Sequence, residues 1–137
     1  MKTILVVDDQ FDVRKLIRIT LGGSYEVLEA EDGATALQLI RRRHPCLVVL
    51  DIMMPGAVDG LQVLDAIRAD TELKTTPIIM VTARGQAKDY DLGMSRGADA
   101  YFIKPFSPAL LLNSIKALTQ AHSGEGLSPA LVLVPIG

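Results

Sequence analysis

Short apolar runs alternate with amphipathic segments five times along the chain, and this alternation predicts a parallel sheet covered by helices. Brief, mostly aliphatic runs are typical of strands that are buried on both faces. Apolar residues spaced three and four apart are typical of helices that pack one face against a sheet. The five expected strands are Thr3–Val7, Tyr25–Ala30, Cys46–Leu50, Pro77–Val81 and Ala100–Ile103.

Turn and capping residues separate these runs and place the expected helices. Aspartate and serine favour helix N-termini, and proline is favoured at the first helical position. Because the connecting loops are short, right-handed crossovers are expected throughout. The sequence therefore predicts an α/β fold in which a doubly wound, parallel sheet of five strands alternates with five helices. The expected helices span 11–21, follow Asp32, Asp59 and Ser107, and cover 86–96.

The segment 86–96 is the weakest of these expected helices. It contains Gly93, and Ala87, Tyr90 and Met94 are its few apolar residues. A glycine inside a helix costs roughly 1 kcal/mol relative to alanine. Because the moving parts of proteins come from elements of low local stability, this helix is the best candidate for a moving element.

Length and charge narrow the classes of protein. A chain of 137 residues fits one domain, and its net charge of −2 argues against non-specific binding to nucleic acid. The only basic run is Arg41–Arg43, which fits the solvated end of a helix better than a nucleic-acid patch. No apolar stretch approaches the roughly 20 residues that span a bilayer. We expect a cytoplasmic domain without direct nucleic-acid or membrane contacts.

The single cysteine and the two histidines are not expected to carry chemistry. Cys46 excludes an internal disulfide and is compatible with a reducing cytosol. It begins an apolar run, so we expect a buried structural thiol. His44 and His122 are expected at solvated helix ends, neither as metal ligands nor as phosphohistidines.

Polar residues follow four of the apolar runs, where the strands of a parallel sheet would end together. Asp8 and Asp9 follow the first run, Asp51 the third, Thr82 the fourth and Lys104 the fifth. Ligands bind at this edge of open α/β sheets. Carboxylates about 4 Å apart repel by roughly 4 kcal/mol at an effective dielectric of 20, so three of them require a cation. Mg²⁺ prefers oxygen ligands, and the set predicts a magnesium site with a phosphorylatable aspartate.

Each of these residues has a simpler interpretation when it is taken alone. Asp8 and Asp9 could cap the following helix, Asp51 could be a turn residue, and Lys104 could be a surface lysine. These interpretations require independent coincidences at one edge of the sheet, which favours a common site.

Four motifs in this order resemble the receiver domain of two-component response regulators. The motifs read ILVVDD, LVVLDIMMPG, IIMVTA and GADAYFIKPF. Each is weak alone, but their order and spacing make the resemblance specific, and it covers about residues 3–121. It implies a flavodoxin-like fold with strand order 2-1-3-4-5. We therefore expect a receiver domain over 1–122 and a tail or linker over 123–137, where Leu131–Val134 could instead add a strand to a sheet edge.

The resemblance also implies the roles of the acidic residues. Asp51 would be the phosphoacceptor, and Mg²⁺ would be the cofactor. Asp9 would bind the metal directly and Asp8 through water, while Asp51 and the backbone carbonyl of Met53 would complete the protein ligands. No general base is required, because an ionised aspartate is already a nucleophile.

By the same resemblance, the remaining residues would sense the phosphoryl group. Thr82 would donate its hydroxyl to a phosphoryl oxygen, and Lys104 would pair with Asp51 and then with the phosphoryl group. Tyr101 would swing inward when Thr82 moves toward the phosphate. The peptide before Pro105 is usually cis in this family.

The implied function is a signalling domain that is not an enzyme beyond its own phosphorylation and dephosphorylation. Its expected upstream partner is a sensor histidine kinase or a histidine phosphotransfer protein. A face made by the helix 86–96, the strand bearing Tyr101 and the helix from Ser107 would control a protein target or self-association. The chain could be a stand-alone receiver or a fragment of a longer protein.

Three alternatives share parts of this pattern. A haloacid-dehalogenase-type phosphatase would need a second aspartate two residues after Asp8, where this chain has Gln10. A flavodoxin-like cofactor module would need a first loop rich in serine, threonine and glycine to hold a phosphate. An inactive receiver used only for binding is disfavoured because no key residue is missing.

Two local features depart from the family pattern or vary within it. Ala57 and Val58 both stand between Gly56 and Asp59, where the family usually has one residue, and they lengthen the loop beside Asp51. Met53 and Arg84 occupy variable positions two residues after Asp51 and Thr82. The resemblance suggests that such a bulky pair slows hydrolysis of the phosphoryl group.

Overall fold

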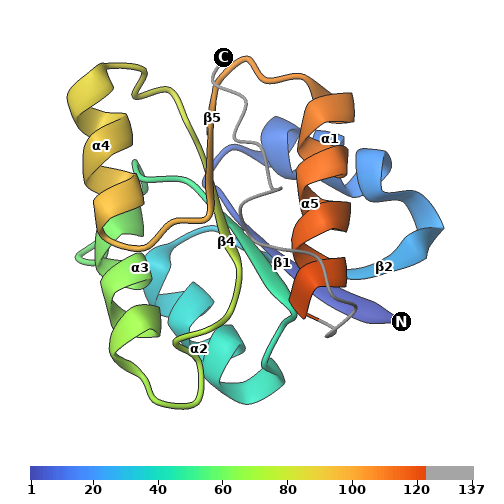
Figure 1. The fold of residues 1–137 in the computed structure, drawn as a ribbon, viewed down its shortest axis with the longest axis horizontal. Coiled ribbons are helices and arrows are strands. Elements are labelled where there is room, and N and C mark those ends of the chain that lie inside the picture. The colour runs from blue at the N-terminus through green and yellow to red at the C-terminus, as the bar shows by residue number, and fades with distance from the viewer. Residues whose placement is uncertain (123–137) are drawn as a thin grey trace.

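The structure, a computed structural model, describes residues 1–122 and contains one sheet of five parallel strands (Figure 1). The strand order is β2-β1-β3-β4-β5, which confirms the expected fold class and topology. The expected tail at 123–137 lies outside the described residues. The strands are β1 (Lys2–Val7), β2 (Tyr25–Ala30), β3 (Leu47–Leu50), β4 (Ile78–Thr82) and β5 (Ala100–Ile103).

Five helices cover the two faces of the sheet. In Figure 1, α1 and α5 lie on one face, and α2, α3 and α4 lie on the other. Right-handed crossovers explain this division, because the chain first moves from β1 outward to β2 and then reverses direction through β3, β4 and β5. The helices are α1 (Phe11–Leu21), α2 (Gly33–Arg43), α3 (Gly60–Ala69), α4 (Ala87–Ser95) and α5 (Pro108–His122), and a 3₁₀ turn (Gly22–Ser24) follows α1.

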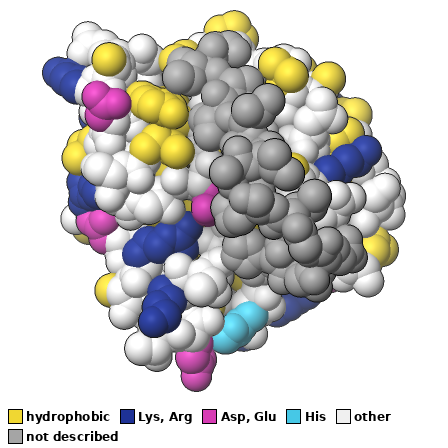
Figure 2. All heavy atoms as spheres, viewed as in Figure 1, with side chains coloured by type: hydrophobic (Ala, Val, Ile, Leu, Met, Phe, Trp, Pro, Cys, Tyr) yellow, Lys and Arg dark blue, Asp and Glu magenta, His cyan; other side chains and the backbone are white. Residues whose placement is uncertain are grey.

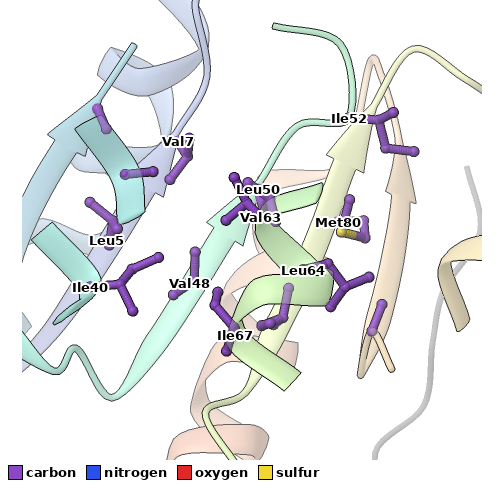
Figure 3. Close-up of a cluster of buried hydrophobic side chains, with 14 of the residues drawn as sticks. Leu5, Val7, Ile40, Val48, Leu50, Ile52, Val63, Leu64, Ile67 and Met80 are labelled. Atoms are coloured by element: carbon purple, nitrogen blue, oxygen red, sulfur yellow. The ribbon is translucent and has the colours of Figure 1, made fainter. Parts of the chain in front are cut away.

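The core consists of two aliphatic clusters, one on each face of the sheet. Figure 3 shows the larger cluster, in which Leu64 and Ile67 of α3 lie over Val48 and Met80 of the sheet. All residues of β3 and β4 are buried. Full burial of each large aliphatic side chain contributes about 1.5–3 kcal/mol, so the central strands and the site at their ends are held firmly.

Most helix ends follow the expected signals. The side chain of Asp59 accepts from the Gln62 backbone and the Gln62 side chain accepts from the Asp59 backbone, which forms a capping box at α3. Asp32 caps α2 by accepting from the Thr35 N–H at 2.7 Å. Gly22 follows α1 with a φ of 60°, a conformation that glycine adopts without strain.

Two expectations need correction near the strand and helix ends. Cys46 is only partly buried, and β3 begins one residue later, at Leu47. This partial burial raises the pKa of the thiol. The alternative in which Asp8 or Asp9 caps α1 is wrong, since Gln10 is the N-cap. His44 is exposed and follows α2, as expected.

The glycine inside α4 has a packing reason. A Cβ on Gly93 would lie 3.2 Å from two ring carbons of Tyr101, so the glycine allows the helix to approach the ring of Tyr101. The helix forms at Ala87–Ser95, and Gly93 is its only buried residue. The helix is therefore held by few buried side chains, as its sequence predicts.

No helix within residues 1–122 is both long enough and apolar enough to cross a membrane.

Candidate phosphorylation and metal site

Three carboxylates meet where β1 and β3 end. One oxygen from each of Asp8, Asp9 and Asp51 lies within 4.8 Å of the others. Asp8 is 2% exposed and Asp51 is 4% exposed, whereas Asp9 faces solvent. The backbone N–H of Asp51 donates to the carbonyl of Val7 at 3.0 Å, so the pairing of β1 with β3 sets the distance between the carboxylates. The predicted cluster is present.

Lys104 lies between the two buried carboxylates. Its Nζ atom is 2.8 Å from Asp8 Oδ2 and 3.0 Å from Asp51 Oδ2. Burial by itself would lower the pKa of this ammonium, but the hydrogen bonds and charges of Asp8 and Asp51 outweigh burial and raise the pKa above its ordinary value. Lys104 therefore carries a positive charge that compensates part of the acidic cluster.

Asp8 is the least exposed of the three acids. Burial raises the pKa of its carboxyl above the usual range, although Lys104 and the Gln10 backbone N–H both donate to it. The charge of Asp51 adds to this increase. A nearby cation would therefore stabilise the ionised form of Asp8.

Gln10 belongs to the site although the sequence reasoning did not include it as a site residue. Its side-chain oxygen accepts from Lys104 Nζ at 2.7 Å across 94 residues of sequence. With Asp8 and Asp51, Gln10 gives the ammonium three oxygen acceptors, which matches its three N–H donors. Its place directly after Asp8 and Asp9 was the only available signal.

An open pocket of about 260 Å³ lies beside Asp51. Asp9, Gln10, Asp51, Met53, Ala83 and Lys104 line it. Its size and its mixture of acidic and basic groups suit a phosphoryl group together with a hydrated cation. Met53 is 52% exposed, and its backbone N–H donates to Asp51 Oδ1 at 3.1 Å.

Thr82 is fully buried at the end of β4 and is not among the residues that line this pocket. Its hydroxyl oxygen accepts from the Arg84 N–H at 3.3 Å. The backbone N–H of Lys104 donates to the Thr82 carbonyl at 2.9 Å, which fixes the ends of β4 and β5 side by side. The structure thus brings Thr82 to the same sheet edge as the carboxylates.

Tyr101 lies inside the protein. It is 0% exposed, and its hydroxyl donates to the carbonyl of Arg84 at 2.7 Å. Its ring contacts Tyr90 edge-on, with centroids 5.5 Å apart. Burial, with the nearby charge of Asp89, raises the pKa of Tyr101 to about 12. The loop after Thr82 is thereby connected directly to β5 and α4.

The lengthened loop after Asp51 packs on the start of α2. A Cβ on Gly33 would lie 2.8 Å from Val58 Cγ1 and 2.9 Å from Val58 Cβ. Val58 is partly buried against the core, so the extra loop residue is accommodated without opening the sheet edge. The peptide bond between Lys104 and Pro105 is cis, as the resemblance implies.

These features define an acidic site that contains a lysine, at the carboxyl edge of a doubly wound α/β domain. Residues 4–116 match the response regulator receiver domain. The chain belongs to the response regulator receiver family, as its motifs indicated.

Several known proteins are similar to this chain. It is 40% identical over 134 residues to the phosphate regulon transcriptional regulatory protein PhoB of Pseudomonas aeruginosa, covering 97% of this chain and 58% of PhoB. It is 42% identical over 121 residues to the transcriptional regulatory protein ResD of Bacillus subtilis, covering 88% of this chain and 49% of ResD.

A solved structure is similar over nearly its whole length. The chemotaxis response regulator CheY4 of Vibrio cholerae aligns with a TM-score of 0.78 and 31% identity, covering 86% of this chain and 98% of CheY4. In contrast, the chain spans about half the length of the curated relatives it matches. The receiver family is a signalling family. The longer relatives resemble this chain over only part of their length.

Proposed function

We propose that this receiver domain accepts a phosphoryl group on Asp51 from a histidine kinase or a histidine phosphotransfer protein, in a reaction that requires Mg²⁺. The observation that carries the proposal is the position of Asp51: a buried carboxylate paired with Lys104 and opening on a pocket beside Asp9. In the transfer, a carboxylate oxygen of Asp51 forms a bond to phosphorus while the phosphorus–nitrogen bond of the phosphohistidine breaks. The imidazole leaves with its electron pair, and no general base is required.

Asp8, Asp9 and Asp51 would hold the metal, with the backbone carbonyl of Met53. The fit rests on oxygen donors from three carboxylates within 4.8 Å, which is the donor chemistry that Mg²⁺ accepts. When bound, Mg²⁺ would neutralise negative charge on the phosphoryl oxygens. Lys104 would supply the second positive charge by exchanging its contacts with Asp8 and Asp51 for one to the phosphoryl group.

Thr82 and Tyr101 would report the phosphoryl group to the rest of the domain. The Thr82 hydroxyl would donate to a phosphoryl oxygen, and the following loop would move with it, carrying the Arg84 carbonyl that binds Tyr101. Because Tyr101 is already inside the protein here, its proposed swing would carry the ring outward in the other state of the switch. Gly93 supplies the room that the inward ring needs.

The output face proposed for this switch is made by α4, β5 and α5. The C-terminal end of α4 is tied to α3, since Arg96 pairs with Asp65 and Arg68 donates to the Gly97 carbonyl at 2.7 Å. Residues 83–88, before and at the start of α4, are all exposed. This contrast favours movement at the start of α4 rather than at its end.

The surface over α4 is suited to a protein partner. Figure 2 shows apolar side chains gathered at the upper left of the view, where Figure 1 draws α4. Leu92 of α4 and Leu110 of α5 are among the exposed large apolar side chains. PhoB and ResD are named as transcriptional regulators, so the proposed output is control of a transcriptional regulator. The regulator would be an attached domain or a separate protein. The proposed location is the cytoplasm.

The decisive test is incubation with Mg²⁺ and acetyl phosphate followed by intact mass measurement. We expect one base-labile phosphoryl adduct that is absent from Asp51→Asn. Asp65→Asn is the matched control, because it removes an exposed aspartate outside the site. An adduct that survives Asp51→Asn, or no adduct at all, would contradict the proposal.

The switch is tested separately by amide hydrogen exchange with and without Mg²⁺ and beryllium fluoride, a phosphoryl mimic. We expect altered exchange at 86–96 and 100–104. Identical exchange in both segments would contradict the proposed output path while leaving the phosphorylation result intact.

A further inference from the structure

Arg14 is the one buried lysine or arginine within residues 1–122, and it lies on α1 beside the acidic cluster. It is 7% exposed. A buried guanidinium lowers stability unless it is fully paired. The groups that pair with Arg14 therefore indicate the role of this residue. No part of the site described above includes it.

The guanidinium bridges the backbone of Asp8 and the end of β2. One terminal nitrogen of Arg14 donates to the Asp8 carbonyl at 2.8 Å, and its Nε donates to Glu29 at 2.9 Å. The other terminal nitrogen lies 3.6 Å from the exposed carboxylate of Glu31. The Phe11 ring lies 5.7 Å from the guanidinium carbon, at a cation–π distance.

The Asp8 carbonyl matters because it belongs to the peptide unit that leads into Asp9. The N–H of Asp8 donates to the Ala30 carbonyl at 3.1 Å, so the main chain of Asp8 is held on one side by β2 and on the other by Arg14. Since a peptide unit is planar, fixing the carbonyl also fixes the start of Asp9.

Asp9 depends on this support more than the other acids do. Asp8 and Asp51 are buried and bonded to Lys104. Asp9 is exposed, and its side chain makes no hydrogen bond or ion pair with residues 1–122 that would hold it over the pocket. Its direction is therefore set by the backbone on which it stands.

We infer that Arg14 is a positioning residue for the metal site: it orients the peptide unit between Asp8 and Asp9 so that both carboxylates face the cation. The inference rests on the proposed Mg²⁺ site and adds a residue to its supporting shell. Groups that orient metal ligands typically change metal affinity by 10–100-fold when they are removed.

A purely structural role for Arg14 predicts a different result. Arg18 stands one turn later on α1, donates to the same Glu29 at 2.6 Å and to the Val27 carbonyl at 3.1 Å, but does not contact Asp8. Arg14→Met and Arg18→Met therefore remove the same charge and each break a link between α1 and β2. Only Arg14→Met frees the Asp8 carbonyl.

The experiment is a MgCl2 titration of the phosphate-free protein by isothermal calorimetry and by amide chemical shifts, with urea unfolding run in parallel. We expect Arg14→Met to bind Mg²⁺ about tenfold more weakly than wild type. The Mg²⁺ affinity of Arg18→Met should stay within about twofold of wild type. Arg14→Lys should restore only part of the lost affinity, because an ammonium lacks the planar group that donates to two partners at once.

Glu29→Gln keeps the inference testable if Arg14→Met does not fold. It removes the carboxylate that orients Arg14 and should weaken Mg²⁺ binding several-fold. Wild-type affinity in both Arg14→Met and Glu29→Gln, or an equal loss in Arg18→Met, would overturn the role of Arg14. Absence of Mg²⁺ binding in the wild type would instead overturn the proposed metal site, and the inference with it.

Discussion

Gly60, the first residue of α3, is the position where one added methyl group should damage both the fold and the site. Its backbone N–H donates to the Ile52 carbonyl at 2.9 Å, and its Cα faces the backbone of Asp51. A Cβ built there lies 2.7 Å from the carbonyl carbon of Asp51 and from Cα of Ile52, and closer still to the Asp51 carbonyl oxygen. Side-chain rotation cannot relieve contacts with backbone atoms.

The size of the effect follows from these contacts. Overpacking typically costs 1–3 kcal/mol. Because the added methyl group would meet backbone atoms, which cannot rotate away, we expect the packing cost of Gly60→Ala to be about 3 kcal/mol. Alanine also restricts the unfolded chain more than glycine does, which stabilises the folded state by roughly 0.4–1 kcal/mol. We therefore expect a net loss of about 2 kcal/mol in the free energy of unfolding. Asp51 would shift by a fraction of an ångström to roughly 1 Å, and such a misplacement can slow phosphorylation by up to about 100-fold.

Urea unfolding followed by circular dichroism measures the loss of stability, and intact mass with acetyl phosphate and Mg²⁺ measures the phosphorylation rate. Gly23→Ala is the matched control, because a Cβ there has nothing within 4 Å. Its stability should stay within about 0.5 kcal/mol of wild type. If Gly60→Ala were as stable as Gly23→Ala, the packing argument would be refuted.

Three further outcomes are expected. Tyr101 should ionise near pH 12 in the ultraviolet difference titration between wild type and Tyr101→Phe, and a midpoint near pH 10 would contradict its buried position. Because this pKa lies above the roughly 10 of a free tyrosine, the stability that the neutral Tyr101 contributes should be complete below pH 10 and lost between pH 10 and 12. Ile67→Ala should lower the free energy of unfolding in urea by about 2–5 kcal/mol, whereas Ile19→Ala, at a residue 65% exposed, should have little effect; equal losses would be inconsistent with the described core. Met53→Asn combined with Arg84→Glu should speed loss of phosphate from the phosphorylated protein, measured by intact mass over time, and an unchanged fast rate in both proteins would argue against shielding by these side chains.

The residue pattern predicted most of the fold because its signals are local. Aliphatic runs, Asp32 and Asp59 as caps, and Gly22 as a helix end each act within a few residues of the chain. The strand ends could therefore be located to within about one residue, and Asp8, Asp9 and Asp51 followed from them. The one-residue shift at Cys46 shows where this reasoning is least reliable, since strand boundaries depend on pairing partners.

By itself, the sequence determined the α/β class, the sheet edge and the polar residues at that edge. The tertiary structure alone decided the contacts of Gln10 and Arg14, the inward position of Tyr101, and the packing reason for Gly93. The physical reason is distance along the chain: Gln10 meets Lys104 across 94 residues, and Gly93 meets the ring of Tyr101 only because α4 packs on β5. Such contacts depend on strand order and helix placement, which a local pattern of polar and apolar residues does not contain.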